Sequence, residues 1–166
     1  MQQFANALTT VRITQHYATS PTRVFDAWLA PQLAGLWLFA TASRPMAKVA
    51  IDARNGGAFC FVERRAGGVI EHRGRYVEIA RPQRLVFVLQ SPDCAPHASR
   101  VTAEFTAHNT GCSLELMHDG LPADHAMPPK GTSCGARWEA RWTGMLYGLD
   151  VVLAQHDTGE SLQKRS

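Results

Sequence analysis

Apolar and polar residues alternate near the start of the chain, and the spacing then becomes helical. Residues 10–18 follow the alternation of a half-buried strand. Ser20 offers a side-chain oxygen that suits a helix N-cap, and Pro21 suits the first helical position. We therefore expect a short amphipathic helix over residues 22–29 and, after a second proline, another over residues 32–37.

The apolar period stays close to two from residue 46 to residue 118. Six strands fit this region, at 48–53, 58–65, 69–80, 84–90, 99–107 and 112–118. The turns between most of them are short and contain glycine or proline. Consecutive strands joined by short turns predict an antiparallel meander, because parallel strands would need long crossover connections.

The last third of the chain returns to a helical pattern. Its apolar residues recur at spacings of three and four, at Trp138, Trp142, Met145, Leu149 and Val152. Charged residues of the same stretch are expected to face water, namely Arg137, Glu139 and Arg141. Gly144 and Gly148 each cost about 1 kcal/mol relative to alanine inside a helix, so we expect a close neighbour or a ligand beside them.

These elements predict one α+β domain over residues 1–166, with a core over 10–154 and a polar, frayed tail over 155–166. We expect a curved antiparallel sheet of about seven strands, two short helices after its first strand, and a long C-terminal helix over it. Loops are expected at 91–96 and 121–131.

Composition and charge narrow the range of partners. Hydrophobic residues make up 45% of the chain and charged residues 19%, which is typical of one globular domain. The net charge of +3 and the lack of a basic run argue against a nucleic-acid partner. The first residues lack the pattern of a secretory signal, and the longest late apolar run, 145–154, is too short for a membrane span. We therefore expect a cytoplasmic protein.

The cysteines and acidic residues offer little metal chemistry. Cys60, Cys94, Cys112 and Cys134 lack the paired spacing of a zinc knuckle or a redox dithiol, so we expect reduced, structural thiols. Cys134 has one alternative, because the N-terminus of the last helix could activate it as a nucleophile. A second cluster could hold a metal only if its loop folded back, and it comprises His118, Asp119, Asp124 and His125. We predict no metal and no cofactor.

Several local motifs resemble those of a known family. They are Pro21-x-x-Val24-Phe25-x-Ala27-Trp28, Asp52-x-Arg54-x-Gly56-Gly57-x-Phe59, Gly74-x-Tyr76-x-Glu78-Ile79, Pro82-x-Arg84-Leu85-Val86-Phe87 and Leu114-x-Leu116-x-His118-x-Gly120-Leu121. This series resembles the homologues of the heat-shock ATPase activator, within the START-like helix-grip superfamily, over residues 11–153. The resemblance implies the helix-grip fold.

The resemblance also implies a choice of functions. Members of the superfamily enclose ligands between the sheet and the terminal helix, and a few relatives are cyclases, dehydratases or binders of antibiotics. The eukaryotic activator stimulates a chaperone ATPase with the help of an additional N-terminal domain. This chain has no room for such a domain, so we do not expect chaperone activation.

Alternation along the strands places the candidate site residues on the face that turns toward the terminal helix. The apolar candidates for a pocket wall are Trp37, Phe59, Phe61, Phe87, Trp138, Trp142 and Met145. Three polar candidates share that face, His72, Tyr76 and His118, and a β-bulge would invert their placement. Each must be satisfied by the protein itself or must orient a ligand or move a proton. Asp52 and Arg54 fall on the outward parity and are expected to form a surface pair at a turn.

Three functions fit this pattern. The first is capture of a small apolar or aromatic molecule in a cavity between the sheet and the C-terminal helix. The second is an enzyme of the cyclase, dehydratase or hydrolase type, in which a pocket histidine moves a proton. The third is a protein-interaction module for a chaperone or another partner, which predicts a filled pocket and an exposed apolar patch. A homodimer is compatible with all three.

Overall fold

The computed structural model describes residues 8–40, 46–91, 98–122 and 133–163, with side chains up to residue 156. The elements follow one another as β1 (Leu8–Tyr17), α1 (Pro21–Leu29), α2 (Pro31–Trp37), β2 (Lys48–Ile51), β3 (Ala58–Arg65), β4 (Gly68–Ala80), β5 (Arg84–Gln90), β6 (Ser99–His108), β7 (Gly111–Pro122) and α3 (Cys134–Gln163). The predicted order of elements and the α+β class are confirmed.

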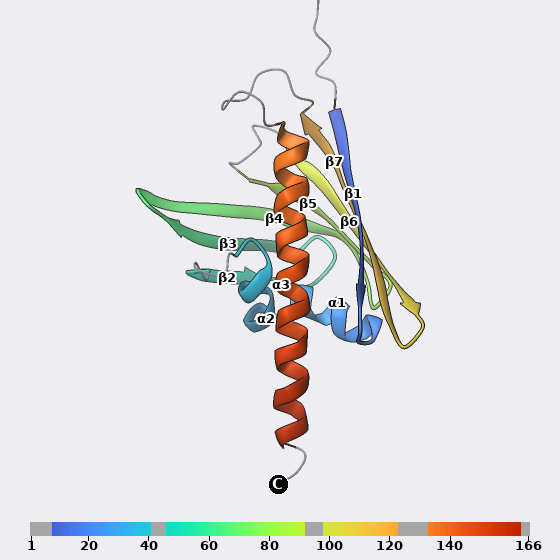
Figure 1. The fold of residues 1–166 in the computed structure, drawn as a ribbon. Coiled ribbons are helices and arrows are strands. Elements are labelled where there is room, and N and C mark those ends of the chain that lie inside the picture. The colour runs from blue at the N-terminus through green and yellow to red at the C-terminus, as the bar shows by residue number, and fades with distance from the viewer. Residues whose placement is uncertain (1–7, 41–45, 92–97, 123–132, 164–166) are drawn as a thin grey trace, which may run out of the picture.

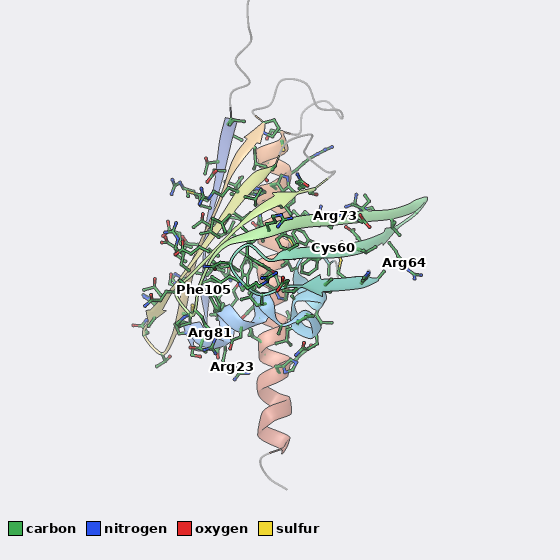
Figure 2. The ribbon with its side chains drawn as sticks, turned by 180° about the vertical axis from the view of Figure 1, so that it is seen from behind. Arg23, Cys60, Arg64, Arg73, Arg81 and Phe105 are labelled. Carbon is green, nitrogen blue, oxygen red and sulfur yellow. The ribbon has the colours of Figure 1, made fainter. Side chains whose placement is uncertain are left out.

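The seven strands form one curved antiparallel sheet in the order β1-β7-β6-β5-β4-β3-β2. Strands β2 to β7 make the predicted meander, and β1 pairs with β7, so the first strand closes the opposite edge. The long helix α3 crosses one face of the sheet, and α1 and α2 lie beside it (Figure 1). Seen from behind, the sheet lies in front of α3, and Cys60, Arg64 and Arg73 lie on the long arm made by β3 and β4 (Figure 2).

The start of α1 follows from its local sequence. The Ser20 hydroxyl oxygen accepts a hydrogen bond from the Arg23 backbone N–H at 3.3 Å, and Pro21 occupies the first turn, as predicted. Val24, Phe25 and Trp28 are buried, so one face of α1 belongs to the core. The predicted amphipathic helix is therefore confirmed.

The predicted alternation also places the core correctly. The inward residues of the strands pack with all three helices into one hydrophobic cluster that includes Phe61, Leu85, Val101 and Leu116. The register of β4 against β5 shifts between Tyr76 and Glu78, which lies after the predicted inward positions and so does not invert them.

The last helix differs from the expectation at its end and at one glycine. It continues to Gln163, so the segment predicted as a frayed tail is largely helical. Gly148 has the expected neighbour, because a Cβ there would lie 3.6 Å from Cβ of Trp37 in α2. A Cβ on Gly144 would meet nothing within 4 Å among the described residues, so no neighbour there offsets its cost.

Candidate functional site

The candidate pocket residues all turn toward the interior. None of the ten is more than 5% exposed: Trp37, Phe59, Phe61, His72, Tyr76, Phe87, His118, Trp138, Trp142 and Met145. Their inward placement from strand and helix periodicity is therefore correct. Their role toward a ligand stays a prediction.

The middle of the interior is closely packed by aromatic side chains. The Trp28 ring lies 4.7 Å from the Trp37 ring and 6.3 Å from the Phe87 ring, and Phe59 lies 5.4 Å from Phe87. The space that Trp28, Phe59, Tyr76 and Phe87 enclose with their neighbours has a volume of about 10 Å³. This is room for about one water molecule, so these four residues form a packed core in this state.

A row of polar side chains crosses the inner face of the sheet nearer the N-terminal end of α3. We call it the polar row, and from β3 to β7 it consists of Glu63, His72, Ser91, Ser99 and His118. Hydrogen bonds join Glu63 to His72 and His72 to Ser91, and another joins Ser99 to His118. All five are buried, so each must find polar partners within the protein or in a ligand.

His118 is fully satisfied by its neighbours. The indole N–H of Trp142 donates to Nδ1 of His118 at 3.0 Å, so in the neutral ring the proton is on Nε2, which donates to Oγ of Ser99 at 2.7 Å. Burial lowers the pKa of His118 from 6.5 to about 4, so the ring is neutral at neutral pH. Both ring nitrogens are occupied, and a role as a proton acceptor would first require Trp142 to release Nδ1.

His72 lies between a carboxylate and a hydroxyl. Its Nε2 is 2.9 Å from Oε2 of Glu63, and its Nδ1 is 3.0 Å from Oγ of Ser91. Burial alone would raise the pKa of Glu63, but hydrogen bonds from Arg65 and His72 outweigh it and hold this pKa below its usual value. Glu63 is therefore an acceptor at neutral pH, and the Nε2 proton of His72 points to it.

Arg141 brings a second guanidinium group to the same carboxylate. Its Nη2 lies 3.4 Å from Oε2 of Glu63 and 3.4 Å from Nε2 of His72. Because both nitrogens are donors, we interpret this geometry as two donors converging on Glu63. The guanidinium carbon lies over the rings of Phe39 and Trp138, at 5.9 and 5.3 Å from their centroids, which places a charge beside two aromatic faces.

His72 has a carboxylate at one ring nitrogen and a hydroxyl at the other. A carboxylate that fixes one ring nitrogen while the other faces a hydroxyl is the arrangement by which histidine takes a proton from serine. Glu63, His72 and Ser91 have this arrangement, at 2.9 and 3.0 Å.

Comparison with known proteins agrees with the fold. The family model described as Activator of Hsp90 ATPase homolog 1-like protein matches residues 18–153. The chain belongs to this family. The fold and the family are those of a ligand-binding or chaperone-related domain. None of the curated proteins matches the chain significantly.

Solved structures show the same fold. A protein from Chromobacterium violaceum is 25% identical with a TM-score of 0.73, and the match covers 87% of this chain and 96% of that one. A protein from Rhizobium loti is 26% identical with a TM-score of 0.67, over 88% and 97% of the two chains. An HSP90 activator from Plasmodium falciparum is 22% identical with a TM-score of 0.65, over 87% and 96%, and that likeness shows the fold alone.

In this member of the activator-homologue family, one prediction about α3 is wrong. Arg141 was expected to face water, but its side chain is 23% exposed and contacts Glu63 and His72. The physical reason is the buried carboxylate on β3, which attracts a guanidinium group that can reach it from the helix. Among the other two expected outward residues, Glu139 is exposed and Arg137 is half-buried.

The cysteine prediction also needs a correction. Cys134 is disulfide-bonded and 1% exposed, so neither a reduced thiol nor a nucleophile is present at this position. Its partner lies outside the described residues, as does Cys94. Cys60 and Cys112 are free, as expected.

The predicted surface pair lies in the described part of the chain, whereas the proposed metal cluster lies partly outside it. Arg54 donates to Asp52 at 2.7 Å on the surface, so the predicted pair at the turn is confirmed. Asp124 and His125 of the proposed metal cluster lie outside the described residues. In the part of the chain that the structure describes, no three His, Cys, Asp or Glu residues form a metal-binding group, and no helix is long and apolar enough to cross a membrane.

Besides Arg65 and Arg141, sequence reasoning missed four residues of the site. Glu63 and Ser99 follow the same inward parity as their neighbours, so alternation could have found them. Phe39 gave no such signal: it has a positive φ of 59°, stacks on His72 with centroids 4.5 Å apart, and donates its backbone N–H to the sulfur of Met145 at 3.0 Å. Ser91 follows the last residue of β5 and was assigned to a loop.

Proposed function

We propose that this protein binds a small aromatic or apolar molecule that carries one polar group, at the N-terminal end of α3. The polar group would meet Arg141 and the Glu63–His72 pair, and the apolar body would lie against the neighbouring aromatic rings. The observation that carries this proposal is the convergence of Arg65, Arg141 and His72 on one buried carboxylate, Glu63.

Such a cluster is difficult to explain by stability alone. Removing charges from water costs several kcal/mol per ion, and their attraction repays this cost only with excellent geometry. Here the contact between Arg141 and Glu63 is long, at 3.4 Å, and the Arg141 side chain is 23% exposed. A guanidinium group that is partly accessible can exchange part of its contact for the polar group of a ligand.

The rings around Arg141 supply the apolar part of the proposed site. Phe39 and Trp138 flank the guanidinium group, and Trp142 lies next to Trp138 with centroids 6.2 Å apart. Aromatic walls with a few fixed polar groups are typical of small-molecule sites. Phe59, Tyr76 and Phe87 would contribute only if the packed core opened, because their neighbours leave a space of about 10 Å³.

A thermal-shift titration tests the proposal. Aromatic carboxylates and their neutral amides would be titrated against the unchanged chain, Arg141→Gln and the surface control Arg54→Gln. We expect a saturable rise in Tm with one or more carboxylates for the unchanged chain and for Arg54→Gln. Arg141→Gln should need a ligand concentration at least about tenfold higher for the same rise in Tm. Native mass spectrometry would then show a bound molecule whose occupancy falls in Arg141→Gln.

Two results would count against this site. If Arg141→Gln and the unchanged chain gave the same titration, Arg141 would not belong to the binding site. The absence of any saturable shift across the panel, with no retained mass in the native spectrum, would remove the small molecule altogether.

A chaperone-related interaction is the second candidate, and two observations favour it. The family is that of the Hsp90 ATPase activator homologues, and α2 and α3 expose apolar side chains at Leu36, Tyr147 and Val151. Tyr147 and Val151 lie one helical turn apart, so they share a face. An Hsp90-type ATPase would be assayed with the unchanged chain and with Tyr147→Ser, and stimulation that this variant loses would support the interaction.

A further inference from the structure

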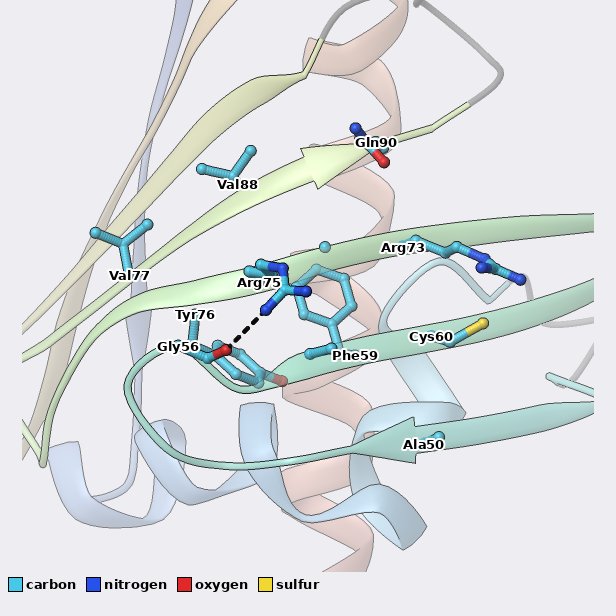
Figure 3. Close-up of a pocket in the computed structure, with 12 residues that line it drawn as sticks. Ala50, Gly56, Phe59, Cys60, Arg73, Arg75, Tyr76, Val77, Val88 and Gln90 are labelled. Carbon is cyan, nitrogen blue, oxygen red and sulfur yellow. Dashed lines mark hydrogen bonds between the residues drawn. The ribbon is translucent and has the colours of Figure 1, made fainter.

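A hollow opens on the face of the sheet that turns away from α3. We call it the outer hollow, and it is lined by outward residues of β2 to β5 that include Ala58, Cys60, Arg73, Arg75, Val77 and Val88 (Figure 3). Its volume is about 650 Å³, which is within the range of small-molecule sites. The residues of the proposed interior site, such as His72 and Arg141, do not line it.

The lining of the outer hollow also includes two aromatic residues of the interior, Phe59 and Tyr76. A Cβ on Gly74 would lie 2.1 Å from the carbonyl oxygen of Val88 and 2.3 Å from Cζ of Phe59. Glycine at this position therefore lets the Phe59 ring pack directly against the backbone of β4. Val77 is 45% exposed at one side, which adds apolar surface.

One positive charge in the outer hollow has no acidic partner. Arg73 donates through Nε to Glu71 at 2.8 Å, so its charge is largely compensated. Arg75 donates through Nη1 to the carbonyl oxygen of Gly56 at 3.2 Å, a neutral group (Figure 3). Within the described residues no carboxylate pairs with Arg75, and Arg100 lies one strand further on, opposite Val88.

We propose that the outer hollow binds a small anionic amphiphile. Its single anionic group pairs with Arg75, and its apolar or aromatic body lies over Ala58, Val77 and Val88. Charge complementarity selects the anion, because an arginine held by a neutral carbonyl keeps its donors and its charge available. The volume of the outer hollow is larger than an inorganic anion alone would fill, so the proposed ligand also has an apolar body. This site is separate from the interior one.

The free thiol of Cys60 provides a reporter inside the outer hollow. Cys60 is half-buried and lines the hollow, whereas Cys112 is 1% exposed. Alkylation of Cys60 by the neutral reagent iodoacetamide would be followed by peptide mass spectrometry. The probe is 8-anilinonaphthalene-1-sulfonate, and N-phenyl-1-naphthylamine is the same ring system without the sulfonate. Inorganic phosphate tests the anion without an apolar body.

The proposal predicts a defined pattern of protection. We expect the sulfonate probe to slow alkylation of Cys60 in a saturable manner, and N-phenyl-1-naphthylamine and inorganic phosphate to protect at least about tenfold less well. Arg75→Gln should weaken protection about tenfold, and Ala58→Leu should weaken it by filling the hollow. Arg12→Gln, an exposed arginine on β1, is the matched control and should keep full protection.

Three outcomes would overturn the proposal. They are an absence of protection, equal protection by the neutral analogue, and protection that Arg75→Gln and Ala58→Leu leave unchanged. Arg141→Gln separates this site from the interior one. Protection that is lost in Arg141→Gln but kept in Arg75→Gln would place the probe between the sheet and α3, which would contradict the outer hollow while supporting the interior site.

Discussion

The indole nitrogen of Trp142 lies 3.0 Å from Nδ1 of His118, and this contact between α3 and β7 determines the tautomer of the histidine. Because an indole N–H can only donate, Nδ1 must accept, and the ring proton remains on Nε2 toward Ser99. The contact also joins the terminal helix to the sheet through a polar group in a mostly apolar interior. Its loss should therefore be visible in the titration of His118.

Trp142→Phe should raise the pKa of His118 above its value of about 4. The indole donor stabilises the neutral ring, and a phenyl ring in its place leaves Nδ1 free and more open to water. The pKa would be followed by NMR of the imidazole protons. Trp138→Phe is the control, because Trp138 packs edge-on against His118 with centroids 4.9 Å apart and makes no described hydrogen bond to it. A similar pKa in both variants would contradict this role of Trp142.

The stability of the protein should fall between about pH 6.5 and pH 4 because of His118. Its pKa in the folded state is about 4, below the ordinary value of 6.5, so the unfolded chain takes up the proton first as the pH falls. The stabilisation is complete above pH 6.5 and decreases as the pH falls to about 4, by about 3 kcal/mol at most.

Urea unfolding at a series of pH values would measure this dependence. His118→Asn removes the titrating ring and should flatten the curve between pH 6.5 and pH 4. The control His156→Gln changes an exposed histidine on α3 and should retain the slope of the unchanged chain. An unaltered slope in His118→Asn would assign the pH dependence to other groups.

Glu63→Gln should destabilise the fold by about 2 kcal/mol, since it leaves Arg141 and His72 without their common acceptor in a buried position. We place the loss below that of a fully buried ion pair because Arg65 and Arg141 reach water in part. The control is Glu71→Gln on the adjacent strand. The Glu71 side chain is 42% exposed and pairs with Arg73, so this change should alter the free energy of unfolding little. Chemical unfolding at pH 7 compares the two, and equal losses would contradict the importance of burial.

Two glycine substitutions should have opposite effects. Gly144→Ala should stabilise the protein by about 0.5–1 kcal/mol, because the added Cβ meets no described atom within 4 Å and alanine favours a helix. Gly74→Ala should destabilise it, because a Cβ there would overlap the Val88 carbonyl and the Phe59 ring. Thermal unfolding would show a higher Tm for the first and a lower Tm for the second. A lower Tm for Gly144→Ala, or a higher Tm for Gly74→Ala, would contradict the packing described around that glycine.

Periodicity alone was sufficient for the elements and for the inward face of the sheet. Strand parity placed His72, Tyr76 and His118 inside, and all three are buried, because side chains of a strand alternate strictly between its two faces. The same rule would have identified Glu63, although charged residues are mostly found at the surface.

Arg141 and Phe39 show what periodicity does not contain. Arg141 turns inward because a carboxylate on a strand far away in the chain lies within its reach, and a helical pattern carries no information about that distance. Phe39 stacks on His72 from a segment with a positive φ, a backbone state that no residue pattern indicated.

The sequence by itself determined the order of the elements, the antiparallel meander and the residues that face inward, because these depend on local spacing and on turns between neighbouring segments. Only the tertiary structure decided how the interior is divided into a packed aromatic core and a polar row, and where the outer hollow opens. The reason is physical: volumes, hydrogen-bond partners and charge pairs are set by residues that are distant in the chain and meet only when the sheet curves and α3 closes over it.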